Sequence, residues 1–289
     1  MCIKNLNGLL VALKKLDRKP NTQLFFRGEA RKHDQIIPAI YRKNGETQKW
    51  IKNEDKIFKE YILRNPNEFV HEKTTFEKLV KMQHYSLPTR LLDISSNPLV
   101  ALFNCCEKYN AAKAADGRFI IFQIPDNRIK FYDSDTVSVV SNICKRPFER
   151  LNIDTPSRRD GEDDNTFKKR FNEENEDIGY LLHEIKEEKP YFLDVIVKAH
   201  LESVWCVRPL LKNPRVIKQD GAFLLFGIQG NKSQCAKMPD EITIQELVID
   251  KNSKLDMLKD LELLGISRDK LYPELDSTAE YLKGKFDIT

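Results

Sequence analysis

The feature that most constrains the fold is a junction at residues 90–106, where a strand pattern runs directly into a capped helix. Arg90 to Ile94 reads as a short strand, and Ser-Ser-Asn-Pro at residues 95–98 provides a helix N-cap followed by proline in the first turn. The apolar run Leu99 to Cys106 then predicts the helix itself. Such a junction offers unpaired backbone N–H groups and the positive end of a helix dipole, so it favours an anion such as a carboxylate or a phosphate.

Size and composition narrow the class of protein. With 289 residues, 40% of them hydrophobic, the chain can bury a substantial core, and we expect one domain over residues 1–289. The net charge of +4, with 32% charged residues, permits a polyanionic partner without requiring one. The six cysteines include no Cys-x-x-Cys pair and no histidine at ligand spacing, so we expect no metal site. No apolar run approaches the roughly 20 residues of a membrane helix, and we expect a cytoplasmic protein with free thiols and no membrane partner.

The order of the predicted elements indicates an α+β fold. Apolar residues at helical spacing predict helices near residues 9–16, 46–65, 75–83, 253–264 and 277–286. Buried strand patterns occur at residues 22–27, 118–124, 191–197, 204–207, 221–227 and 246–249. Helices therefore cluster in the N-terminal half and at the C-terminus, and no regular βαβ alternation is present.

Residues 154–189 differ from the rest of the chain, because they are rich in charged residues and asparagine and poor in large apolar ones. This composition predicts a charged surface insertion, either partly helical or a mobile loop. Basic pairs such as Arg158-Arg159 could form a phosphate-tracking patch. The interleaved acids at residues 162–164 favour an ordinary solvated face instead.

Five short motifs, taken in order, resemble the FRG domain family, which is named for its Phe-Arg-Gly motif. They are Phe26-Arg27-Gly28, Met82 to Tyr85, Pro88 to Asp93, Asn97 to Leu102 and Gln219 to Phe223. Gly265-Ile266 and Leu271 to Leu275 are similar to the usual ending of the family. The resemblance covers most of the chain, and residues 154–189 lie outside its motifs.

The resemblance implies both a fold and an activity. FRG domains distantly resemble ADP-ribosyltransferases, which break the nicotinamide–ribose bond of NAD and pass ADP-ribose to an acceptor. We therefore expect a split β-sheet core of that type, NAD as the substrate, and a macromolecular acceptor, either RNA or protein. The resemblance further implies a bacterial toxin or phage-defence effector with a possible antitoxin partner.

The resemblance also suggests site residues. Arg27 matches by position the arginine that holds the NAD phosphates or ribose, and Asp93 to Ser96 matches the Ser-Thr-Ser strand that braces the pocket. The glutamate of a later strand has no counterpart, since only Gln219 and Asp220 stand near the expected place. An amide can hydrogen-bond a ribose hydroxyl but cannot stabilise a cationic transition state by charge. The catalytic candidates are His84, Asp93 and Gln219, and the NAD-binding candidates are Arg27, Gly28, Thr89, Arg90, Ser95 and Ser96.

Each candidate also has a structural interpretation. Arg27 can hold a phosphate through its planar guanidinium or form an ion pair with Glu29 or Asp93. His84 can act as a general base near neutral pH or tie a loop to the backbone.

Arg90 and Asp93 are three residues apart on one strand, so they face opposite sides and one of them is structural. We expect that residue to be Asp93, with its carboxylate orienting Arg27 or capping the helix at Asn97. Ser95 or Ser96 contacts the cofactor or serves as the helix cap.

Three functions follow from these residues. The leading hypothesis is an NAD-dependent ADP-ribosyltransferase. An NAD glycohydrolase would use the same pocket and transfer ADP-ribose to water. A non-catalytic module that binds a nucleotide or a partner is the third, and the missing glutamate favours it. Nicotinamide release separates the first two from the third.

Overall fold

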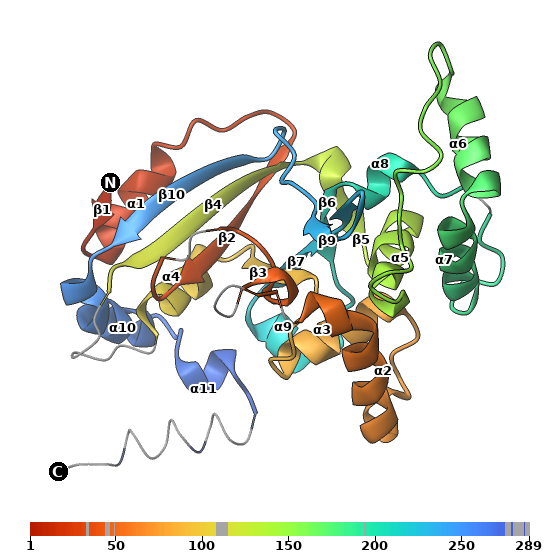
Figure 1. Ribbon diagram of the computed structural model, residues 1–289. Coiled ribbons are helices and arrows are strands. Elements are labelled where there is room, and N and C mark those ends of the chain that lie inside the picture. Colours follow the sequence, from red (N-terminus) through yellow and green to blue (C-terminus); the bar gives the residue numbers. More distant parts are fainter. Residues whose placement is uncertain are drawn as a thin grey trace.

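The computed structural model describes residues 1–32, 35–43, 47–48, 50–107, 115–193, 195–274, 279 and 286. Its centre is an eight-stranded mixed sheet with the strand order β1-β10-β4-β2-β3-β7-β6-β5 (Figure 1). The strands of this sheet are β1 (Cys2–Ile3), β2 (Thr22–Glu29), β3 (Leu91–Ser95), β4 (Gly117–Pro125), β5 (Ile129–Phe131), β6 (Val204–Arg208), β7 (Gly221–Phe226) and β10 (Thr243–Ile249). A separate hairpin pairs β8 (Ile228–Gln229) with β9 (Asn231–Cys235).

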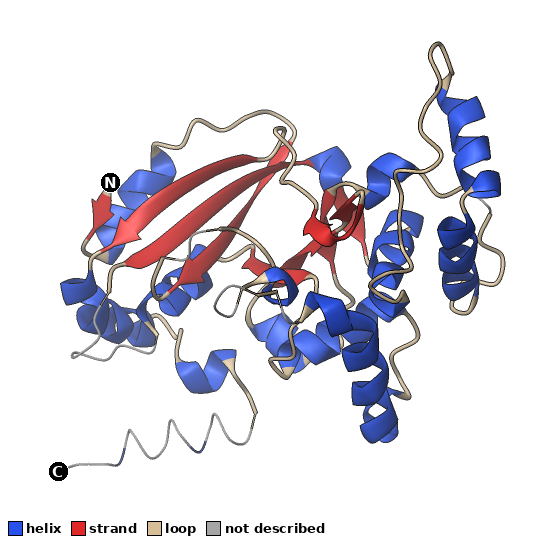
Figure 2. Ribbon diagram, in the orientation of Figure 1, coloured by secondary structure: helices blue, strands red, loops and turns tan. Residues whose placement is uncertain are grey.

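The helices that pack beside this sheet are drawn in blue in Figure 2. They are α1 (Leu6–Lys14), α2 (Glu54–Arg64), α3 (Thr75–His84), α4 (Pro98–Cys106), α5 (Asp135–Asn142), α6 (Asp164–Glu174), α7 (Glu176–Lys186), α8 (Lys198–Leu201), α9 (Pro214–Lys218), α10 (Lys254–Leu263) and α11 (Arg268–Leu271). The predicted α+β class is confirmed. The predicted clustering of the helices is wrong, because α5 to α9 fill the middle of the chain.

The strand-to-helix junction has the predicted form. β3 ends at Ser95, and α4 begins at Pro98 after the N-cap Asn97. Oδ1 of Asn97 accepts a hydrogen bond from the backbone N–H of Leu99 at 2.9 Å. The cap is therefore the asparagine and neither serine. Its side chain satisfies one of the amide groups that the first helical turn leaves unpaired.

The sheet is narrowly joined in the middle. β2 pairs with β4 along its whole length, whereas β2 and β3 share only the register pair Phe26 and Ser95. The sheet thus consists of a β1-β10-β4-β2 part and a β3-β7-β6-β5 part. Because opposed residues in a ladder point to the same face, Phe26 and Ser95 face one side, and Arg27 faces the other.

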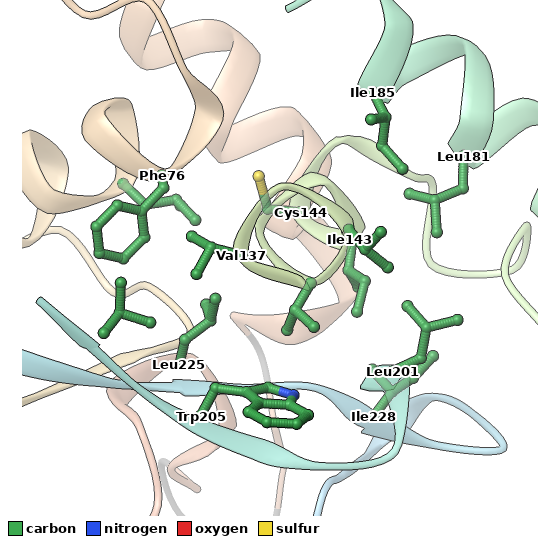
Figure 3. Close-up of a cluster of buried hydrophobic side chains, with 14 of the residues drawn as sticks. Phe76, Val137, Ile143, Cys144, Leu181, Ile185, Leu201, Trp205, Leu225 and Ile228 are labelled. Atoms are coloured by element: carbon green, nitrogen blue, oxygen red, sulfur yellow. The ribbon is translucent and has the colours of Figure 1, made fainter. Parts of the chain in front are cut away.

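The long helices lie on the face to which Phe26 points, called here the helix face. Under the β2 part, α1, α4 and α10 enclose a buried apolar cluster with Phe26. Under the β3 part, α3, α5 and α7 enclose another, in which α5 lies between the sheet and α7 (Figure 3). On the opposite face the apolar residues, among them Phe25 and Leu224, are covered by the β8–β9 hairpin and the segment around Ile242, so we call it the loop face.

The prediction of some helix within residues 154–189 is confirmed by α6 and α7. Its alternative, a mobile loop, is wrong, because these helices bury Phe171, Ile178 and Leu181 completely against the core. The charged positions of these helices hid the few apolar ones in the sequence. Residues 191–193 and 195–197 form no strand and lead instead into α8. The helix predicted at residues 277–286 lies outside the described residues apart from Ala279 and Phe286.

Candidate functional site

A cleft lies on the helix face, between α3, α9 and the adjoining ends of β3 and β7. Its inner part is a cavity of about 30 Å³ whose lining includes His84, Asp93, Arg215 and Gln219. Its outer part is a hollow of about 400 Å³ that shares His84 and Arg215 with the cavity. A hollow of that size falls within the range of small-molecule sites, about 300–1,000 Å³. The structure therefore brings all three predicted catalytic residues to one place.

Arg215 is the most prominent side chain of this cleft, and the sequence analysis did not single it out. Its Nη1 donates to the backbone oxygen of His84 at 3.0 Å, and its guanidinium stacks on the ring of Tyr272 at 4.6 Å from the centroid. No carboxylate of the described residues lies within 4.0 Å of it. Asn213-Pro214, an N-cap and first-turn proline like Asn97-Pro98, was the signal that could have drawn attention to it.

The hollow also carries two lysines, and both have carboxylate partners. Nζ of Lys212 lies 2.8 Å from Oε1 of Glu77, and Nζ of Lys81 lies 3.4 Å from Oε1 of Glu72. Their charges are partly neutralised by these acids. Arg215 thus remains the cation of the hollow that is most available to an anionic ligand.

Asp93 belongs to the cleft, and a chain of hydrogen bonds fixes its carboxylate. Its Oδ2 accepts from Nε2 of Gln83 at 2.8 Å, and Oε1 of Gln83 accepts from the hydroxyl of Thr89 at 2.7 Å. Thr89 is buried and so orients Gln83 and touches no ligand itself. The expectation that the Asp93 carboxylate caps α4 or binds Arg27 is wrong, because Asn97 caps the helix and Arg27 binds the Asp93 carbonyl at 2.8 Å.

Ser95 and Gln219 join the turn before β7 to the end of β3. The hydroxyl of Ser95 donates to the backbone oxygen of Gln219 at 2.6 Å and accepts from the backbone N–H of Asn97 at 2.9 Å. Nε2 of Gln219 donates to the backbone oxygen of Leu271 at 3.0 Å. Ser95 is thus used within the fold, and the Gln219 side chain anchors the C-terminal segment beside the cleft.

Two predicted NAD-binding residues, Arg27 and Ser96, lie away from the cleft. The guanidinium of Arg27 is on the loop face, where its Nε donates to Oε1 of Glu29 at 3.1 Å, as the structural alternative predicts. Ser96 lines a different hollow, of about 500 Å³, together with Asp220 and Arg208. Through its bond to the Asp93 carbonyl, Arg27 holds the two parts of the sheet together at their narrow junction.

Gly28 serves packing. A Cβ atom added at this position would lie 1.8 Å from the backbone oxygen of Ala101. The absence of a side chain lets β2 pack directly on α4. The structure therefore supplies a reason for this glycine that needs no ligand.

Arg90 is enclosed in the core, so the prediction that it contacts NAD is wrong. Its side chain is 0% exposed, Nη2 lies 2.5 Å from Oε2 of Glu54, and Nη1 donates to the backbone oxygen of Phe226 at 2.9 Å. Nζ of Lys232 lies 2.8 Å from the same oxygen of Glu54. Burial alone would raise the pKa of Glu54, but the two cations hold it below its usual value.

His84 lies where the cavity and the hollow meet. Its Nε2 lies 3.0 Å from Oε1 of Glu274, a residue of the C-terminal segment that the sequence analysis did not select. The ring of Tyr85 packs edge-on against it at 4.8 Å between centroids. Burial, the largest cause, and the nearby Arg215 lower the pKa of His84 below its ordinary value.

Two further observations bear on the class of ligand. Across the part of the chain that the structure describes, no three histidine, cysteine or acidic side chains converge as a metal site requires. Within the same residues, no helix combines the length and apolar character needed to cross a membrane.

Comparison with known proteins adds one finding. The FRG domain family matches residues 22–114. No curated protein and no solved structure matches the chain. The matched range contains His84 and Asp93, whereas Arg215, Gln219 and Glu274 follow it, so the cleft is completed by residues beyond the matched range.

Proposed function

We propose, from a chain whose residues 22–114 match the FRG domain family, that this protein is an NAD-dependent ADP-ribosyltransferase. Its acceptor would be a macromolecule, either RNA or protein. The observation that carries the proposal is the guanidinium of Arg215, which lies beside His84 in a hollow of about 400 Å³ and has no carboxylate partner among the residues that the structure describes. A guanidinium that no acid neutralises, in a site of this size, suits the pyrophosphate of a dinucleotide.

The remaining cleft residues suit the other parts of NAD. Tyr85 is 53% exposed beside the hollow and offers a ring surface to a base or to nicotinamide. Asp93 and Gln219 line the inner cavity, which at about 30 Å³ admits no whole ribose. A carboxylate and an amide there can hydrogen-bond a ribose hydroxyl that points into it from the hollow. A carboxylate there also supplies the negative charge that Gln219 cannot bring to an oxocarbenium-like transition state.

The family resemblance supports a biological setting as part of the same proposal. The protein would act as a bacterial toxin or phage-defence effector, held in check by an antitoxin. Transfer to an essential RNA or protein would account for toxicity.

The test uses purified protein and NAD labelled in its adenylate part, incubated with a cell lysate. The products are split into RNase-treated and protease-treated halves, and nicotinamide release is followed in parallel. We expect label on a macromolecule, and its sensitivity to one of the two treatments names the acceptor class. Free labelled ADP-ribose would instead indicate the glycohydrolase, and bound but intact NAD would indicate a non-catalytic module.

The variant Arg215→Met tests whether the pyrophosphate of NAD binds at Arg215. Losing the charged hydrogen bonds should weaken NAD binding by about 1.5–3 kcal/mol, or roughly 10- to 100-fold in Kd. Arg128→Met is the matched control, because Arg128 also stacks on an aromatic ring, that of Trp205 at 4.9 Å, but does not line the cleft. Equal NAD affinity in wild type and Arg215→Met would overturn this assignment.

A further inference from the structure

The C-terminal segment after α10 folds back onto the cleft and brings Glu274 to it. The backbone oxygen of Leu271 accepts from Nε2 of Gln219 at 3.0 Å, and the Leu271 side chain is buried. The hydroxyl of Tyr272 donates to Oδ1 of Asn104 in α4 at 3.1 Å. These contacts with α4 and with the end of α9 fix the backbone that precedes Glu274, and so fix where its carboxylate lies.

Glu274 and His84 meet with several polar atoms left without partners. Nε2 of His84 and Oε1 of Glu274 are 3.0 Å apart. Nδ1 of His84 and both carboxylate oxygens of Glu274 are buried, and among the described residues none of them has a hydrogen bond of standard geometry. Each unsatisfied buried polar atom costs about 1–3 kcal/mol. Their grouping at the rim of a hollow is more easily explained by a ligand than by stability.

We propose that His84 is the general base of the reaction and that Glu274 is the residue that positions it. This inference rests on the proposed ADP-ribosyl transfer. A carboxylate beside Nε2 keeps the proton of the neutral imidazole on Nε2 and fixes the ring. The lone pair of Nδ1 has no hydrogen-bond partner among the described residues, so it can accept a proton once the bound ligand brings a hydroxyl to this buried atom. The carboxylate stabilises the imidazolium that results.

The proposed transfer of ADP-ribose conserves atoms and electrons. A hydroxyl oxygen of the acceptor forms a bond to C1′ of the nicotinamide ribose as the glycosidic C–N bond breaks. The electron pair of that bond leaves with nicotinamide and neutralises its ring charge. The hydroxyl proton passes to Nδ1 of His84, and the resulting positive charge lies against Glu274.

The surroundings of His84 keep its ring neutral and so ready to accept a proton. Burial lowers the pKa of His84 most, and the charges of Arg215 on α9 and Lys81 on α3 lower it further. Glu274 of the C-terminal segment and Asp93 of β3 raise it without cancelling these effects.

The experiment is a double-variant cycle with His84→Gln and Glu274→Gln, read by nicotinamide release from NAD in the presence of the labelled lysate fraction. We expect each single variant to lower kcat about 100-fold or more, and the double variant to lose no more than His84→Gln alone. We also expect the acidic limb of kcat/KM in Glu274→Gln to move to lower pH, because the carboxylate charge that raises the pKa of His84 is gone. A contact that only supports the fold would leave that limb in place.

Glu241→Gln is the matched control. Glu241 likewise lies beside a basic side chain, that of Arg128 at 2.8 Å, but away from the cleft, so kcat should stay at the wild-type value. Wild-type protein that neither binds nor cleaves NAD would contradict the proposed function itself. Wild-type turnover combined with an unchanged rate and pH profile in Glu274→Gln would leave the transfer standing and overturn the role of the pair. Losses that simply multiply in the double variant would overturn it as well.

Discussion

The segment Pro88 to Asp93 carries polar clusters of opposite character on its two sides. On one side, Arg90 meets Glu54 and Lys232 in the core, where all three side chains are at most 4% exposed. On the other side, Asp93 shares an open cleft with His84 and with Arg215, a cation that has no acidic partner within the described part of the chain. The first cluster is closed to any ligand, and the second is accessible to one.

This difference shows that the side of the strand, rather than the type of residue, decides what a charge does here. The guanidinium of Arg90, which the sequence analysis assigned to NAD, is part of the core. The carboxylate of Asp93, which it expected to orient Arg27 or cap a helix, faces the cleft instead. Neighbouring residues of β2 likewise have different surroundings on the two faces of the sheet. Arg27 points to the loop face, while Gly28 packs on α4. Substitutions on the closed side should therefore change stability, and those on the open side should change ligand binding.

Arg90→Ala should give the largest effect. It removes a fully buried guanidinium from Glu54 and from the carbonyl of Phe226, so Lys232 remains as the one cation that the structure shows beside Glu54. Breaking a buried pair costs about 3–5 kcal/mol. We expect a loss of that size in the free energy of unfolding, measured by urea denaturation. Asp93→Asn is the comparison from the open side and should cost less than about 1 kcal/mol, because its carboxylate is exposed. Similar costs for both variants would remove the distinction between the clusters.

Gly28→Ala should give the next largest effect. The added methyl group meets the backbone of α4, which must shift, and overpacking of this kind costs about 1–3 kcal/mol. Gly179→Ala in α7 is the matched control, because nothing lies within 4 Å of the added Cβ. There, alanine should stabilise the helix by about 0.5–1 kcal/mol. If the two substitutions shifted the urea midpoint in the same direction, the close packing of β2 on α4 could not be the reason for Gly28.

The sequence predicted well what short stretches of chain determine. The N-cap and proline at Asn97-Pro98, the strand before them and the buried strand at residues 117–125 all depend on neighbouring residues, and all are present. The predicted catalytic set, His84, Asp93 and Gln219, also meets in one cleft, because α3, β3 and the turn before β7 pack together.

What the sequence did not predict depends on distant parts of the chain. Arg27 lies on the loop face because of the register of β2, which pairs along its whole length with β4, a strand distant in the sequence. Arg215 and Glu274 complete the cleft from segments more than 100 residues beyond His84, and no local pattern marks them as neighbours. The burial of α7 likewise depends on its packing against α5, and that of α6 on its packing against α7, which a charged composition conceals.

The smallest predicted effect is a dependence of the free energy of unfolding on pH, which should come from the cleft and not from the core cluster. In the core cluster the Glu54 carboxyl stays ionised between pH 7.5 and 5.5, because Arg90 and Lys232 hold its pKa below the usual value against the effect of burial. In the cleft, by contrast, His84 can change its protonation state in this range. Burial, with Arg215 and Lys81 nearby, lowers the pKa of His84 in the folded protein beneath its unfolded value of about 6.5, against the opposing charges of Glu274 and Asp93.

As the pH falls below about 6.5, the unfolded chain therefore binds a proton at His84 that the folded protein does not yet bind, and the free energy of unfolding decreases. We expect urea denaturation at pH 7.5 and 5.5 to show a larger decrease for wild type than for His84→Gln. His200, whose pKa burial also lowers, contributes equally to both proteins and cancels in this difference. Equal decreases would mean that the cleft histidine titrates as freely in the folded protein as in the unfolded chain. The cleft cluster of Asp93, His84 and Arg215 would then not shift the pKa of its histidine, and this difference from the core cluster would disappear.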